Sequence, residues 1–197
     1  MGITLRQFEQ LQSRSRRAAP AIEANVGSAR THSTILGIDP SVRGTGFGII
    51  RIEKRQPAAL GHGTVHCPAN WERSRCLAQI ARAIREQIEK FRPTACIVEG
   101  LFYAQNFQTA LIMGEARGAS LVAAAEAGLE IFEIAPRKVK QAIVGYGAAQ
   151  KLAVAKMVQR TLNLAALPEA DAADALALTL AYVQSASRYS FDPPKRV

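Results

Sequence analysis

From Thr34 onward, the apolar positions of the chain follow two periods, which together predict alternating strands and helices. Short β-branched or alternating runs predict five strands, at residues 34–39, 45–52, 59–66, 95–99 and 130–134. Helical spacing or alanine-rich composition predicts helices, the first capped by Asn70, at residues 71–91, 105–128, 137–143, 150–162 and 171–187. These elements place the chain in the α/β class.

The lengths of the connections predict how the strands pair. Two short turns join the first three strands, which favours an antiparallel meander, whereas a helix joins the third strand to the fourth. We therefore expect the fourth strand to run parallel to the first. This order of elements is that of the RNase H-like fold, a five-stranded mixed sheet flanked by helices.

The first 33 residues differ from the rest of the chain in composition. They contain five arginines against two glutamates, and they lack the apolar stretch of a secretory signal. We predict a flexible, basic N-terminal extension at residues 1–33, one α/β domain at 34–187 and a C-terminal tail at 188–197.

Composition limits the classes of function. The chain has 197 residues, 48% hydrophobic and 21% charged, so it can bury one sizeable core. No apolar run approaches the roughly 20 residues that cross a bilayer, and three cysteines without a CxxC pair favour a reducing cytoplasm. The formal net charge of +9 favours a nucleic-acid partner, with a solvated basic surface as the alternative.

Four acidic residues lie where predicted elements meet the core. Asp39 ends the first strand, Glu99 ends the fourth, and Asp171 and Asp174 lie three apart at the start of the last helix. Since parallel neighbouring strands end at one edge of a sheet, we expect all four side chains to converge there. Converging carboxylates repel one another unless a cation lies between them, and Mg²⁺ or Mn²⁺ prefers such oxygen ligands. Two ions about 4 Å apart can activate a water and hold a phosphodiester.

Each acid also has an ordinary structural explanation. Asp171 can act as a helix N-cap, Asp39 can shape the turn before Pro40, and Glu99 can be a solvated strand end. A different class of protein is also compatible with GIDPSVRGTG, because actin-like ATPases and sugar kinases begin with a strand, an Asp and a phosphate-binding hairpin. Those proteins need a second Asp-x-Gly hairpin, whereas the later acidic pair of this chain opens a helix without glycine.

Four long segments resemble the RuvC family of Holliday-junction resolvases, in the order and spacing of that family. They are GIDPSVRGTGFGII, VEGLFYAQNFQTALIMGEARGASLVAAAEAG, APRKVKQAIVGYGAAQK and ADAADALALTLAY, and the resemblance covers residues 34–183. It implies a homodimeric, Mg²⁺-dependent endonuclease of the retroviral integrase superfamily that nicks two opposing strands of a four-way DNA junction symmetrically. The implied partners are junction DNA, a second copy of the chain and the RuvA-RuvB branch-migration complex. No association with a membrane is expected.

The resemblance also implies roles for individual residues. Asp39, Glu99, Asp171 and Asp174 match the family's catalytic, metal-binding acids, with Lys151 as a catalytic cation. The implied cofactor is Mg²⁺, two ions per active site, for which Mn²⁺ can substitute.

Further residues match DNA contacts of the family: Phe102, Arg117, Arg137, Lys140 and Lys151. Phe102 resembles an aromatic residue that stacks on bases, which is typically worth ~1–3 kcal/mol per base. The alternative is that Phe102 packs in the core at its strand end. Without the resemblance, lysines on an exposed helix would be ordinary solvated surface.

Two glycines, Gly114 and Gly118, lie four apart within the predicted helix 105–128. A mid-helix glycine costs ~1 kcal/mol relative to alanine, so a compensating close contact is expected. The helix can pack closely on its own sheet or on its twin across a two-fold axis. A dimer suits two symmetric cuts, because these need two active sites related by two-fold symmetry.

Two other functions stay open for the same fold. One is a protein that binds junctions without cutting them, and cleavage of a synthetic junction would exclude it. The other is a nuclease for RNA or RNA–DNA hybrids, which competition between substrates would reveal.

Overall fold

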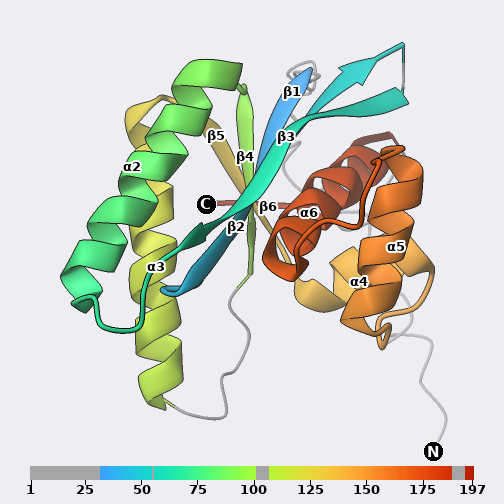
Figure 1. The fold of residues 1–197 in the computed structure, drawn as a ribbon. Helices are drawn as coiled ribbons and strands as arrows, with labels where there is room; N and C mark the ends of the chain where they lie inside the picture. Colours follow the sequence, from blue (N-terminus) through green and yellow to red (C-terminus); the bar gives the residue numbers. More distant parts are fainter. Residues whose placement is uncertain (1–31, 55, 101–106, 188–193) are drawn as a thin grey trace, which may run out of the picture. The chain divides into compact units, whose positions relative to one another are not determined.

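The computed structural model describes residues 32–197, apart from residues 55, 101–106 and 188–193. In this part of the chain, one sheet has strand order β3-β2-β1-β4-β5-β6, with helices on both faces (Figure 1). The strands are β1 (Thr34–Asp39), β2 (Gly44–Glu53), β3 (Gln56–His66), β4 (Ala95–Glu99), β5 (Glu130–Ile134) and β6 (Lys195–Arg196). The helices are α2 (Arg73–Phe91), α3 (Phe107–Glu126), α4 (Pro136–Val144), α5 (Lys151–Thr161) and α6 (Ala170–Ser187).

The pairing of the strands confirms the expected mixed sheet. β1, β2 and β3 form an antiparallel meander, while β4 runs parallel to β1 and β5 runs parallel to β4. The parallel strands follow from their helical crossovers, since α2 returns the chain to β4 and α3 returns it to β5. The RNase H-like prediction is therefore confirmed in class and topology.

The core has two layers, one on each face of the sheet. On β1, Ile35 contributes to the layer beneath α4, α5 and α6, whereas Leu36 and Ile38 contribute to the layer beneath α2 and α3. The buried positions of α2 recur every four residues, as expected for a helix with one apolar face: Cys76, Ile80, Ile84 and Ile88. Alternation in the strands and helical spacing thus produce the two layers directly.

The predicted number of strands was wrong, because β6 makes a sixth. Lys195 pairs with Glu133 and Arg196 with Phe132 on the outer edge of β5, and the amide of Val197 donates to the Ile131 carbonyl at 3.0 Å. A basic, two-residue strand has no apolar alternation, so no periodicity could indicate it. Part of the predicted C-terminal tail is therefore a strand, while residues 188–193 lie outside the described residues.

The predicted helix cap at Asn70 was also wrong. Glu72 occupies the N-cap position and α2 begins at Arg73. Just before this, the Trp71 amide donates to the Pro68 carbonyl at 3.1 Å, so the chain first makes a turn there.

Residues 1–31 of the predicted extension at 1–33 lie outside the described residues. The same is true of Phe102. Within the described part of the chain, none of the helices has the length and apolar character needed to cross a bilayer.

Candidate active site

Helix α6 lies directly against β1 and β2 because the strand positions beneath it are glycines. A Cβ atom at Gly46 would lie 2.0 Å from the carbonyl oxygen of Asp171, and one at Gly37 would lie 2.1 Å from that of Ala175. Any larger residue would push the helix off the sheet. The sequence signal for this packing is the alternation of glycine in GTGFG, which the predictions above did not use.

This close packing brings the predicted acids together above one end of the sheet. Asp39 is the last residue of β1 and Glu99 the last of β4, and these strands are parallel neighbours. α6 contributes Asp171 and Asp174 from above. The Asp171 carboxylate lies over the start of β2, since its Oδ2 is 2.6 Å from where Gly44 would carry a Cβ.

The electrostatics of Asp39 show that the four acids interact. Burial, followed by the negative charges of Glu99, Asp174 and Asp171, raises the pKa of Asp39 to about 7. Burial and the charge of Asp174 also raise the pKa of Glu99, although a hydrogen bond with Asp39 opposes this rise. Without a cation, this group of carboxyls cannot all ionise at neutral pH at low cost.

One lysine already partly offsets this negative charge. Lys151, the first residue of α5, donates from its Nζ to Asp174 Oδ2 at 2.6 Å. This hydrogen bond, with the charges of Asp174, Asp39 and Asp171, raises the pKa of Lys151 despite partial burial. Lys151 therefore stays cationic beside the acids, while two thirds of its side chain is exposed to solvent.

The other predicted basic residues of this region lie on α4. The charge of Lys140 counteracts the raised pKa of Glu99, which places Lys140 near the acids. Arg137 is exposed, and its Cγ lies 2.5 Å from where a Cβ on Gly147 would be. Gly145 ends α4 in the left-handed region, with φ of 94°, a conformation that suits glycine. The segment VGYG therefore turns directly after α4, beside the basic residues of that helix.

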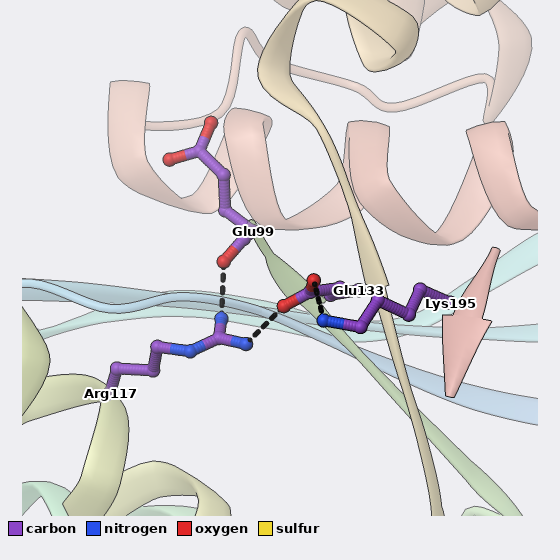
Figure 2. A network of polar contacts seen from close by, with 4 residues as sticks. All are labelled: Glu99, Arg117, Glu133 and Lys195. Carbon is purple, nitrogen blue, oxygen red and sulfur yellow. Dashed lines mark hydrogen bonds and ion pairs between the residues drawn. The ribbon is translucent and has the colours of Figure 1, made fainter. Parts of the chain in front are cut away.

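Arg117 lies elsewhere than the predicted DNA contact requires. Its side chain on α3 is only 9% exposed, and its guanidinium donates to the backbone carbonyl of Glu99 and, at 2.8 Å, to Glu133 (Figure 2). A buried guanidinium with two protein acceptors is not available to a phosphate. The sequence signal for this arrangement is a pair of opposite charges, one in the apolar helix α3 and the other in the apolar strand β5.

The four acids have the type of ligand atom that a hard divalent cation prefers, but their side chains are not arranged around a common point. All four offer oxygen donors, and a cation would relieve the repulsion that raises the pKa of Asp39. Among the residues that the structure describes, no three Asp, Glu, His or Cys side chains are arranged as the ligands of one ion. Asp174 is held by Lys151 instead, so metal binding requires side-chain movement there.

Comparisons with known proteins agree on one family. Residues 35–182 match the family model described as crossover junction endodeoxyribonuclease RuvC. The chain is 45% identical over 152 residues to the protein of that name from Akkermansia muciniphila, covering 77% of this chain and 91% of the relative. It is 42% identical over 158 residues to that of Syntrophomonas wolfei, covering 80% and 92%.

A solved structure gives the same result in three dimensions. The fold is similar to that of Thermus thermophilus RuvC in complex with Holliday junction substrate, with a TM-score of 0.76 and 32% sequence identity. The match covers 84% of this chain and all of that one.

Proposed function

Because the chain belongs to the RuvC family of crossover junction endodeoxyribonucleases, we propose that it resolves Holliday junctions by symmetric paired nicks. The observation that carries this proposal is the grouping of Asp39, Glu99, Asp171 and Asp174 at one end of the sheet. Burial and mutual repulsion raise the pKa of Asp39 in that group, which prepares the site for a cation. A site that only bound DNA would not need a group of acids that requires a cation.

The four acids would hold the metal, which we propose to be Mg²⁺, two ions per site, with Mn²⁺ as a substitute. When bound, such ions supply an activated water and neutralise charge on the phosphodiester. The chain's own contribution is placement: Asp39 and Glu99 come from neighbouring parallel strands, and Asp171 and Asp174 from α6.

Lys151 provides the second part of the proposed chemistry. Its ammonium group is paired with Asp174, and most of its side chain faces solvent. Asp174 would exchange this ion pair for a bound cation, and Lys151 would then be available to neutralise negative charge on the scissile phosphate. Lys140, close enough to influence Glu99, and the exposed Arg137 extend this positive region along α4 as contacts to the DNA backbone.

We propose a homodimer that forms through α3. Leu111 and Val122 on this helix are each 52% exposed, and nothing in the described chain lies within 4 Å of the Cβ positions of Gly114 and Gly118. These four residues are spaced three or four apart, so they share one face of the helix. A second copy of the chain fits this face best, because paired symmetric cuts need two active sites related by a two-fold axis.

Two parts of the proposal rest on the family resemblance. One is delivery of the junction by the RuvA-RuvB complex. The other is a cytoplasmic location, which suits the free, buried thiols of Cys67, Cys76 and Cys96.

The test uses the full chain, a mobile four-way junction and mapping of the cuts on all four strands. We expect paired cuts with Mg²⁺, none with EDTA, and no cutting of the matched linear duplex. Asp39→Asn should abolish cleavage but retain junction binding, since the amide has the same shape without the charge. Mg²⁺-dependent nicking by this variant would refute the catalytic site. Binding without cleavage by the wild type would identify a junction-binding protein, and preference for an RNA–DNA duplex would identify a hybrid nuclease.

A further inference from the structure

Glu99 belongs to a chain of polar contacts that reaches the C-terminal strand (Figure 2). Arg117 donates to the Glu99 carbonyl and to Oε2 of Glu133, while Lys195 donates to Oε1 of Glu133 at 3.2 Å. The two carboxylate oxygens of Glu133 therefore connect α3 to β6. The contacts run from the active-site end of β4 to the last residues of the chain.

Given the proposed function, we propose that Arg117, Glu133 and Lys195 position Glu99 for metal binding. The C-terminal strand thereby takes part in the active site without touching the metal or DNA. Arg117 and Glu133 lie within the residues that match the family model, 35–182, whereas Lys195 lies beyond them.

Arg117 controls the backbone of Glu99 and leaves its side chain available. Figure 2 shows the Glu99 carboxylate pointing away from Arg117, whose contact is with the carbonyl. On the other side of the same peptide unit, the Gly100 amide donates to the Ile134 carbonyl at 2.9 Å. The final peptide of β4 is thus fixed at both its C=O and N–H groups, which sets the direction of the Glu99 side chain.

Glu133 keeps Arg117 in this position. A guanidinium that is 9% exposed needs a paired carboxylate, because an unpaired buried charge is strongly destabilising. Glu133 meets this need from the next-to-last position of β5, where it is paired in the sheet with Val98 on one side and Lys195 on the other. Loss of the Glu133 charge would let the guanidinium move toward solvent and away from Glu99.

Lys195 acts more weakly than the other two residues, and its neighbour provides a matched control. The Lys195 side chain is 77% exposed, so its ion pair with Glu133 is largely screened by water. Arg196, the next residue of the same strand, pairs instead with Glu130 at 3.6 Å. Glu130 lies at the opposite end of β5 from Ile134, the residue beside Glu99, and side-chain alternation places it on the opposite face of the sheet from Glu133.

The experiment measures Mn²⁺ binding by electron paramagnetic resonance in the absence of DNA, with junction affinity in EDTA and thermal unfolding as parallel readouts. The variants are Arg117→Lys, Glu133→Gln, Lys195→Met and the control Arg196→Met. We expect Arg117→Lys and Glu133→Gln to weaken Mn²⁺ binding about 10-fold, the lower end of effects for residues that orient metal ligands. Lys195→Met should produce a smaller change in the same direction, and Arg196→Met none.

Two further readouts separate positioning from general stabilisation. Junction affinity in EDTA should stay at the wild-type value, and cleavage by Glu133→Gln should recover as the Mg²⁺ concentration is raised. Unchanged Mn²⁺ binding in Glu133→Gln would overturn the inference, as would an equal loss in Lys195→Met and Arg196→Met. If Arg117→Lys does not fold, Glu133→Gln decides, because glutamine keeps the size of the side chain and removes only its charge.

The binding measurement also distinguishes this inference from the proposed function. If the wild type binds Mn²⁺ through Asp39 but cuts no junction, the proposed function fails while the effect on binding still tests the inference. If Asp39→Asn binds Mn²⁺ as the wild type does, the metal site itself is wrong and both fail.

Discussion

Two alanine-rich helices, α6 and α3, cover opposite faces of the sheet, and glycine serves each of them differently. Beneath α6 the glycines are in the strands, and a Cβ at Gly37 or Gly46 would lie within about 2 Å of the helix backbone. On α3 the glycines are in the helix itself, and nothing described lies within 4 Å of a Cβ at Gly114 or Gly118. The first arrangement builds a contact within the chain, whereas the second leaves a surface for another molecule.

The comparison explains why the proposed chemistry lies on the α6 side. A helix that approaches the strand backbone closely can hold its carboxylates beside those at the strand ends, and this raises the pKa of Asp39 and Glu99. The α3 side contributes no carboxylate to the group. Instead, Arg117 on α3 holds the backbone of Glu99 from below.

The largest expected effect is that of Gly46→Ala, which tests the close contact between α6 and β2. The new methyl group would collide with the backbone of Asp171, so α6 must move off β2. We expect a loss of about 1–3 kcal/mol in the free energy of unfolding, typical of overpacking. Cleavage should fall on the order of 100-fold, as for a displacement of about 1 Å at an active site. Urea unfolding and single-turnover cleavage measure the two effects.

Gly118→Ala is the matched control for the stability measurement. Within a single copy of the chain, the same methyl group on α3 meets no described atom within 4 Å, and alanine is favoured over glycine within a helix by ~1 kcal/mol, so the comparison is made on the monomer. This variant should be as stable as the wild type or slightly more stable. Equal destabilisation by the two variants would contradict the distinction between the helices.

The second prediction concerns the pH dependence of the metal-free protein. The pKa of Asp39 is raised from its ordinary value near 4 to about 7, so the folded protein holds a proton on Asp39 more tightly than the unfolded chain does. The stability that this proton contributes is complete below about pH 4 and is lost as the pH rises through 7. We expect the free energy of unfolding in EDTA to fall over this interval by on the order of a few kcal/mol. Urea titrations at pH 5 and pH 8 measure this difference.

Asp39→Asn is the test of the cause of this pH dependence. The amide does not ionise, so the variant should lose most of the pH dependence and be more stable than the wild type at pH 8 in EDTA. Mg²⁺ should stabilise the wild type more at pH 8 than at pH 5, because the metal binds the ionised carboxylates. An identical pH dependence in both proteins would show that Asp39 is not the group responsible.

The third prediction concerns the open face of α3. Leu111→Glu places a charge among exposed apolar and small residues, and we expect it to raise the dimer dissociation constant about 10-fold or more. Sedimentation velocity measures the change, and the paired cuts should become independent single nicks. Leu167→Glu is the control, since Leu167 is also exposed but does not lie on α3. Loss of the dimer in the control alone would place the interface elsewhere.

The sequence predicted the regular parts of the fold well because their signals are local. β1, β4 and β5 have the predicted bounds, since each is a short apolar run between breaks in the pattern. The four acids could be found for a related reason: each marks the end of a strand or the start of a helix. Their convergence followed from one topological inference, that β4 runs parallel to β1.

What the sequence did not predict depends on contacts between distant segments. β6 has no periodicity of its own and exists through its pairing with β5. The surroundings of Arg117 are set by Glu133 and the Glu99 carbonyl, and neither lies near it in the sequence. The glycines in β2 were visible, but their purpose depends on which helix lies above them. These three features need the fold before they can be understood.

The smallest expected effect is that of Arg73→Ala. Arg73 and Arg117 each form an ion pair with a glutamate, and α3 takes part in both pairs. Arg73 on α2 contacts Glu115 on α3 at 3.0 Å, but its side chain is 53% exposed, whereas Arg117 is buried. Because water screens an exposed pair, Arg73→Ala should cost less than about 1 kcal/mol in the free energy of unfolding. Mn²⁺ binding should be unchanged, in contrast to Arg117→Lys. If Arg73→Ala weakens Mn²⁺ binding as strongly as Arg117→Lys does, loosening of α3 accounts for both, and the contact with the Glu99 carbonyl has no special part.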